Sequence, residues 1–147
     1  MGLSLPASHI TVNLAPADVV KEGTHYDLPI AMALMGAMGI IPSESIASFM
    51  MMGELGLDGS IRAVSGVLPA SIAATRHDLG FICPMGQGGE ALWSGNDTIF
   101  EPQTLLSLLN HFKGRTILPP PIPGKAQDFE LLPDMADIKG QESAKRA

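Results

Sequence analysis

The sequence has little cysteine, few aromatic residues and little charge. Its 147 residues include one cysteine, Cys83, and only 16% are charged, below the roughly 25% of an ordinary globular protein. A single cysteine excludes an intrachain disulfide and a multi-cysteine zinc site, and is typical of a reducing compartment. No apolar run reaches the 18 residues that would predict a membrane span, and Met1–Pro6 lacks the basic start of a signal peptide. We therefore expect a cytoplasmic protein with no membrane partner.

Apolar residues are plentiful by comparison. They make up 46% of the chain, too many for a disordered protein, and a single domain of this length buries about 70% of its unfolded surface. Cations are scarce in residues 1–112, where ten acids face three cations: Lys21, Arg62 and Arg76. Because an acidic body repels phosphate backbones, this segment is expected to bind nucleic acid poorly, and any nucleic-acid role would have to come from elsewhere.

The pattern of the first half predicts strands and one buried helix. Alternating β-branched residues predict a strand over Ile10–Leu14. Asp27 is expected to cap a helix over Leu28–Met38, which is apolar nearly all round and which Gly39 ends. Further on, Asp58-Gly59 is a hairpin signal, and we expect it to join strands over residues 49–57 and 60–64.

The second half alternates in the same way. We expect a helix over Gly66–Leu79 closed by Gly80, strands over residues 81–84 and 98–100, a short helix over residues 88–92, and a final helix whose stripe runs from Leu105 to Phe112. Interleaved helices and strands with a central hairpin predict an α+β fold. We expect two layers built on one mixed sheet rather than a purely parallel one.

The composition changes at Leu118. Residues 119–123 read Pro-Pro-Pro-Ile-Pro and predict a stiff polyproline connector. We therefore expect one domain over residues 1–117, a Pro-rich linker over residues 118–134, and the truncated start of a further domain over residues 135–147. The last seven residues have a helical composition but are too few to form a stable helix alone.

Motifs for ligands are weak. Residues 86–91 resemble a G-x-G-x-x-A dinucleotide turn, but no strand-end acid occurs about 20 residues later, so an ordinary glycine-rich turn is favoured. Gly124-Lys125 lacks the upstream glycine and the following Ser or Thr of a phosphate-binding loop. The four histidines are scattered without ligand spacing. We expect this chain to hold neither a cofactor nor a metal.

Four segments together resemble the N-terminal region of the magnesium-chelatase-like AAA+ ATPases, the ComM competence-protein family. The first is Ile10–Asp18, and the second is Lys21–Gly23 followed by Asp27–Ala31. The third is Gly53–Gly59 with Val67–Pro69, and the fourth is Asp137–Glu142. The resemblance covers essentially the whole chain. It implies a Lon-protease-like domain with the ribosomal-protein-S5 domain-2-like fold, whose first strands would precede Met1. It also implies an AAA+ module beginning near Asp137, with ATP and Mg²⁺ bound by that parent module.

The resemblance also bears on catalysis. Lon-type proteolysis needs a serine nucleophile and a lysine base. The Lon-like pattern K-D-G-P-S-A-G aligns with residues 21–27, which places His25 at the serine position, and the lysine position falls at Pro69. Residues 66–79 contain no lysine at all, and Arg76 cannot serve as a base because it does not deprotonate. We therefore expect no catalytic residue in this chain.

The leading hypothesis is a non-proteolytic accessory domain of an AAA+ motor. The resemblance implies a hexameric ATPase acting on DNA, by branch migration in natural transformation, with this domain contacting its own AAA+ module and sister subunits. One alternative is a divergent hydrolase that uses His25 and Asp27 with a Ser or Thr not located by the sequence. Another is a stand-alone protein-binding module. Whether the chain itself is an enzyme stays open between these hypotheses.

Overall fold

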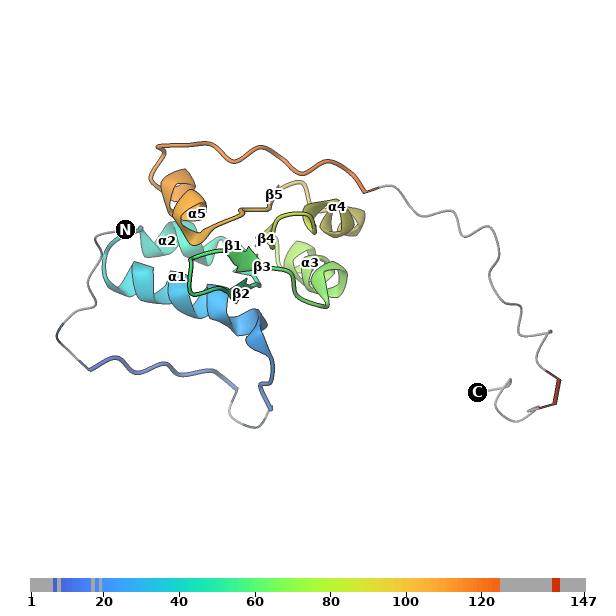
Figure 1. The fold of residues 1–147 in the computed structure, drawn as a ribbon, viewed down its shortest axis with the longest axis horizontal. Coiled ribbons are helices and arrows are strands. Elements are labelled where there is room, and N and C mark those ends of the chain that lie inside the picture. The colour runs from blue at the N-terminus through green and yellow to red at the C-terminus, as the bar shows by residue number, and fades with distance from the viewer. Residues whose placement is uncertain (1–6, 8, 17, 19, 125–138, 141–147) are drawn as a thin grey trace.

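The computed structural model describes residues 7, 9–16, 18, 20–124 and 139–140. Its elements all lie between residues 24 and 112 (Figure 1). In chain order they are the 3-10 helix η1 (Thr24–Tyr26), α1 (Asp27–Ala37), α2 (Ser43–Ala47), β1 (Phe49–Met51), β2 (Glu54–Leu55), β3 (Ile61–Arg62), α3 (Val67–Arg76), β4 (Gly80–Ile82), α4 (Gly88–Ala91), the 3-10 helix η2 (Leu92–Ser94), β5 (Ile99–Phe100) and α5 (Leu105–Phe112).

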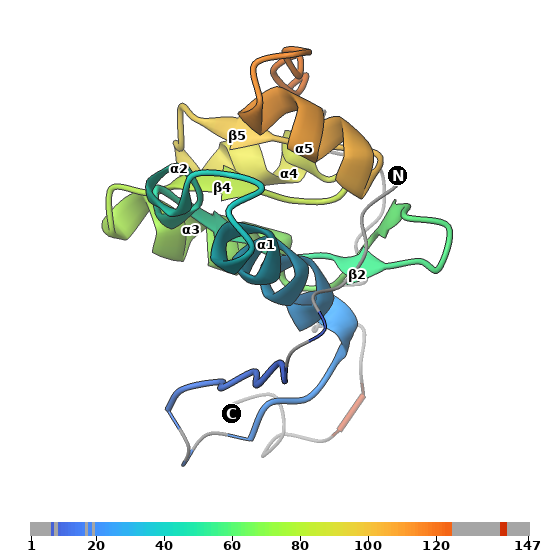
Figure 2. The same cartoon turned by 90° about the vertical axis from the view of Figure 1, so that its left-hand side faces the viewer.

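The strands form two sheets. β1, β4 and β5 make a parallel sheet in the order β1-β4-β5, with Met50 beside Phe81 and Phe81 beside Ile99. β2 and β3 pair antiparallel across the Asp58-Gly59 turn, and this hairpin projects from the body in Figure 2. The predicted hairpin is therefore confirmed. The predicted single mixed sheet is wrong in detail, because parallel and antiparallel pairs occur in separate sheets within the described residues.

The parallel sheet is covered on both faces. Phe81 packs with Val67, Ala74 and Ala91 from α3 and α4, and its neighbour Ile82 belongs to a second apolar cluster formed with α1 and α5. Successive side chains of a strand point to opposite faces, and parallel sheets are normally buried on both. Mixed α and β structure is thus as expected, but the described residues form three layers where the sequence predicted two.

Gly53 separates β1 from β2, so the predicted continuous strand over residues 49–57 is wrong. Its N–H donates to the carbonyl of His25 at 3.1 Å, and its carbonyl accepts from the N–H of Leu28 at 3.0 Å. A Cβ at this position would lie 2.8 Å from Cγ2 of Ile61. The backbone at Gly53 therefore bonds to the start of α1 instead of continuing the parallel ladder.

Helix α1 runs over nearly the predicted residues, but its cap differs. Tyr26 is the N-cap residue and Asp27 is the first helical residue. The carboxylate of Asp27 accepts a hydrogen bond from the N–H of Leu55 at 3.3 Å, so it ties β2 to the helix rather than capping it. Gly39, with φ 68°, comes after the helix as predicted.

Helix α3 ends three residues before the predicted Leu79, and Gly80 does not close it. Its C-cap residue is His77, and the left-handed position after it is Asp78, with φ 55°. Gly80 instead begins β4, where a Cβ would clash with Cε1 of Phe49 on the neighbouring strand. Glycine is needed at residue 80 because the Phe49 ring occupies the space that a side chain there would fill.

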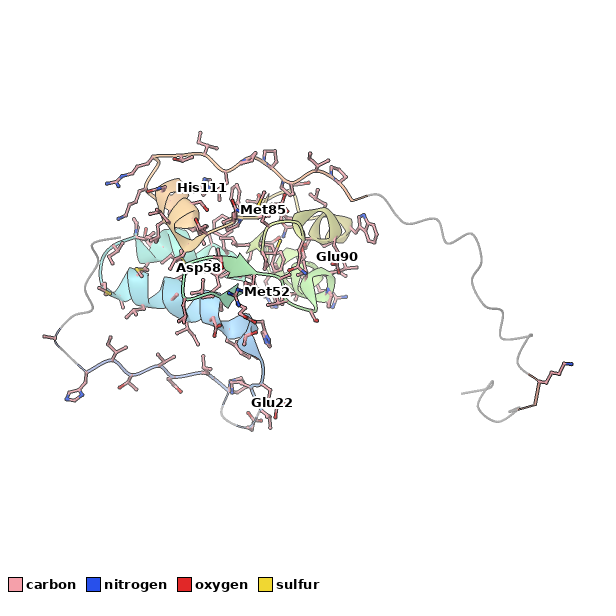
Figure 3. The ribbon with its side chains drawn as sticks, in the orientation of Figure 1. Glu22, Met52, Asp58, Met85, Glu90 and His111 are labelled. Atoms are coloured by element: carbon pink, nitrogen blue, oxygen red, sulfur yellow. The ribbon has the colours of Figure 1, made fainter. Side chains whose placement is uncertain are left out.

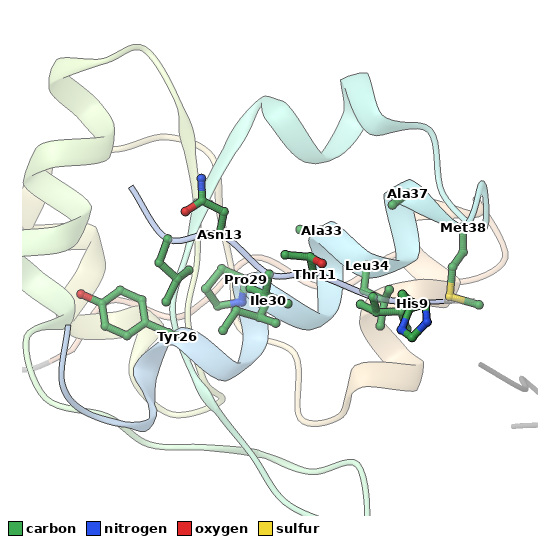
Figure 4. Close-up of a pocket in the computed structure, with 13 residues that line it drawn as sticks. His9, Thr11, Asn13, Tyr26, Pro29, Ile30, Ala33, Leu34, Ala37 and Met38 are labelled. Carbon is green, nitrogen blue, oxygen red and sulfur yellow. The ribbon is translucent and has the colours of Figure 1, made fainter. Parts of the chain in front are cut away.

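The strand predicted over Ile10–Leu14 is not present. Residues 9–14 run beside α1 without a strand partner in the described part of the chain (Figures 1 and 4). Ile10, Val12 and Leu14 are 43%, 54% and 39% exposed. An alternating pattern determines which side chains of an extended segment point to the same side. A strand forms only where a neighbouring strand completes the backbone hydrogen bonds of that segment.

The last helix, α5, begins at a capping box. The hydroxyl of Thr104 accepts from the N–H of Ser107 at 3.1 Å, and Ser107 pairs back with the N–H of Thr104. Residues 115–124 turn back across the body without helix or strand, and Leu118 packs against the core. Of the segment expected to begin an AAA+ module, only Lys139 and Gly140 are described, and the rest of that prediction lies outside the described residues.

Candidate functional site

The turn before α1 holds the residue aligned with a Lon-type nucleophile. Gly23, with φ 100°, leads into η1, and the His25 ring packs against the Tyr26 ring in a tilted arrangement, with ring centroids 4.0 Å apart. A Cβ on Gly23 would lie 2.9 Å from Nδ1 of His25, so glycine leaves room for the imidazole. His25 is half-buried, and its backbone carbonyl is bonded to Gly53.

Polar side chains around this turn form a hydrogen bond and an ion pair with one another. The hydroxyl of Thr24 donates to Oε2 of Glu54 at 2.6 Å, and Oε1 of Glu54 lies 3.6 Å from the guanidinium of Arg62. Asp27 bonds to the N–H of Leu55 in β2. Within the described residues no hydrogen bond joins the imidazole of His25 to the carboxylate of Asp27. The structure thus brings these two side chains into one turn without pairing them.

Pro69 lies in the first turn of α3 and is exposed. The helix begins at Val67 after its N-cap residue Gly66, whose φ is 88°. Pro69 is well placed in the first turn because that turn does not need its missing N–H. Its ring carries no proton acceptor. If the alignment with a Lon-type lysine is right, this position supplies no base.

The glycine-rich turn at residues 86–91 is closed by a carboxylate of the same chain. Oε2 of Glu101 accepts from the N–H of Gly86 at 2.9 Å and from the N–H of Gly88 at 3.0 Å. Backbone N–H groups arranged in this way are the usual cradle for a phosphate. Here Glu101 occupies that cradle, so the turn has no room for a dinucleotide phosphate without displacing it.

Cys83 lies directly after β4 and is fully buried. Burial raises the pKa of the Cys83 thiol to about 12, and the negative charges of Glu101 and Glu90 add to this effect. Only a thiolate is a good nucleophile, so this cysteine is chemically inert and belongs to the core.

A hollow lies between residues 9–14 and α1. It has a volume of about 550 Å³, and Pro29, Ile30, Ala33 and Leu34 form much of the helix side of its wall (Figure 4). His9 is the one histidine among the residues that line it. Such a wall suits apolar contact, and His9 and Tyr26 lie at opposite ends of it (Figure 4).

The described residues provide neither a metal site nor a membrane span. Among them, no three His, Cys, Asp or Glu side chains gather closely enough to hold a metal ion. Nor does any described helix have the length and apolar character to span a bilayer.

The sequence did not predict the polar residues that join distant elements. Glu101 is one, and Gln87 is another, since its side-chain amide pairs with both backbone groups of Val64, at 2.7 and 3.0 Å. A signal for Glu101 did exist. It comes directly after β5, β5 lies beside β4, and the carboxyl ends of adjacent parallel strands meet at one edge of a sheet.

Comparison with known proteins identifies the family. The family model for subunit ChlI of Mg-chelatase matches residues 1–87, more than half of the chain. Competence protein ComM of Haemophilus influenzae is 37% identical over 147 residues, covering 97% of this chain. The uncharacterized proteins YifB of Salmonella typhimurium and Mb2921c of Mycobacterium bovis are 32% and 34% identical over 145 and 147 residues, each covering 99% of this chain. This chain spans 29% of the length of each of these relatives. The chain therefore belongs to the Mg-chelatase-like family that includes ComM and YifB.

Proposed function

We propose that this chain is a non-proteolytic, Lon-like accessory domain of a Mg-chelatase-like AAA+ ATPase. The parent would be a cytoplasmic, hexameric, ATP-dependent motor that acts on DNA by branch migration in natural transformation. The family membership and the likeness to a protein named for competence support this assignment. The proposal includes the S5 domain-2-like fold, which the mixture of helices and strands supports in outline.

The observation that carries the proposal is the chemistry at the two aligned positions. Where a Lon-type protease would place serine and lysine, this chain has His25, held in a turn against Tyr26, and Pro69, which offers no base. Cys83, the one thiol, is buried and inert. A role in assembly and positioning requires none of these groups to react.

ATP and Mg²⁺ are assigned to the parent module and not to this chain. The glycine-rich turn is filled by Glu101, and the described residues offer no set of metal ligands. The same division applies to DNA. The acidic composition of residues 1–112 favours contacts with protein neighbours, namely the AAA+ module and sister subunits, over contacts with a phosphate backbone.

The test compares the full-length protein with this 147-residue chain. We expect ATP hydrolysis by the full-length protein only, and cleavage of unfolded protein substrates by neither. Stimulation of the ATPase by branched DNA would support action on DNA, and its absence would refute that part of the proposal. Peptidase or esterase turnover that His25→Ala abolishes would overturn the accessory role and favour the hydrolase. A full-length protein without ATPase activity would instead favour a binding module.

A further inference from the structure

After α5 the chain does not leave the body directly. Residues 115–124, here called the strap, cross the surface from the end of α5 to α4 (Figures 1 and 3). The N–H of Leu118 donates to Nδ1 of His111 at 3.2 Å near its start, and the N–H of Gly124 donates to the carbonyl of Gly89 at 3.3 Å at its end. Between these bonds Pro121 is buried. The strap is thus attached at three places along its length.

Two glycines of α4 form the surface on which the strap rests. A Cβ on Gly89 would lie 2.8 Å from the backbone N of Gly124 and 2.8 Å from the carbonyl oxygen of Ile122. A Cβ on Gly88 would lie 2.5 Å from Cβ of Pro121. These separations are too short for real contacts, and at Gly89 the obstacle is backbone, which no side-chain rotation can relieve. Any side chain at residue 89 must therefore displace the strap.

The surface under the strap is itself bonded to the rest of the body. The N–H of Gly88 donates to the carboxylate of Glu101. The hydroxyl of Ser71, fully buried in α3, donates to the carbonyl of Ala91 at 3.1 Å and lies 2.7 Å from the hydroxyl of Ser94. The surface under the strap is therefore joined by hydrogen bonds through α4 and η2 to α3.

We propose that the strap is a docked tether: its start is held by α5, and its end at Gly124 is held by α4 and, through α4, by α3. The Gly88–Gly89 pair is its receptor. This inference rests on the proposed function only in placing an AAA+ module beyond the strap. In that setting the strap fixes the point at which movements of the motor reach this domain, and Gly89 acts as a positioning residue without touching nucleotide or DNA.

The test measures backbone order in this 147-residue chain by NMR. In the wild-type protein we expect order parameters for the N–H groups of Ile122 and Gly124 near 0.85, the value of rigid backbone. In Gly89→Ala we expect them to fall below about 0.6, the range of flexible segments, while Phe81 and Ile82 in β4 keep their values. Gly36→Ala is the matched control, because a Cβ there meets mainly the movable ends of Ile46 and Ser43 at 3.0 and 3.3 Å.

Every outcome decides the proposal. Order parameters at Ile122 and Gly124 that stay near 0.85 in Gly89→Ala would overturn it, as would values already below about 0.6 in the wild-type protein. If Gly89→Ala does not fold, Pro121→Gly provides the same test, since it removes the ring packed over Gly88 and leaves α4 intact. An unchanged strap in that variant overturns the proposal. A full-length protein without ATPase activity would refute the proposed function and leave the docked strap standing.

Discussion

The amide of Gln87 should contribute about 2 kcal/mol to the stability of the fold. It donates to the carbonyl of Val64 at 2.7 Å and accepts from the N–H of the same residue at 3.0 Å, which ties the segment after β3 to the turn before α4. Each such bond contributes about 1 kcal/mol net. Gln87→Met, which keeps the shape and loses both bonds, should lower the free energy of unfolding by about 2 kcal/mol. For a chain of this size that is a fall in Tm of about 4–8 °C.

Urea denaturation followed by circular dichroism measures this loss, with an unchanged m-value as the sign that both proteins unfold in the same way. Gln103→Met, at an exposed position, is the matched control and should stay within about 0.5 kcal/mol of the wild type. Gln87→Glu separates the two bonds. It keeps the acceptor for the N–H of Val64 but sets a carboxylate against the carbonyl, so stability should fall while that amide stays protected from hydrogen exchange. A Gln87→Met protein as stable as the control would refute the reasoning.

Three other features of the molecule lead to predictions of the same kind. Cys83 should resist alkylation in the native protein at pH 8, because with a pKa of about 12 only roughly one thiol in ten thousand is ionised, and rapid labelling would contradict its burial. Gly59→Val should destabilise the protein by at least about 1 kcal/mol, since φ is 82° there, and Gly59→Asn should cost less; equal midpoints in urea for the two variants would count against this. Hydrogen bonds from the hydroxyl and N–H of Ser60 lower the pKa of the Asp58 carboxyl group in the folded protein. The ionised Asp58 carboxylate therefore stabilises the fold above the pKa that Asp58 has in the unfolded chain, and this stabilisation is lost as pH falls through the pKa of Asp58 in the folded protein. The stability difference between wild type and Asp58→Asn should therefore shrink below about pH 4 and vanish in stronger acid, which denaturation at several pH values checks.

Local chemistry predicted those parts of the fold that depend on neighbouring residues. The apolar run of α1, its end before Gly39 and the Asp58-Gly59 hairpin are each determined by residues within a few positions of one another. Predictions were wrong where a distant group decides the outcome. Gly53 interrupts the strand because His25 and Leu28 bond to its backbone.

The same distinction applies to the candidate site. Nothing near residues 86–91 shows that a carboxylate more than ten positions later fills that turn, and only the pairing of β4 with β5 brings Glu101 there. Likewise, the sequence around Gly80 indicates the end of a helix. Only the structure shows that glycine is required there because the ring of Phe49, on a neighbouring strand, lies against it. The assignment of His25 and Pro69 to the positions of a Lon-type dyad rests on alignment and stays a prediction.

The separation of the hairpin from the parallel sheet has a consequence for the order of folding. Glu54 pairs with Arg62 only eight positions along the chain, a closure that takes microseconds. Phe49 pairs with Gly80 thirty-one positions away, and that contact forms only after α3 has crossed over the sheet. We therefore expect the hairpin to be present in the transition state and the parallel ladder to form late. Substitutions in the Asp58-Gly59 turn would then mainly slow folding, whereas those along β4 would mainly speed unfolding.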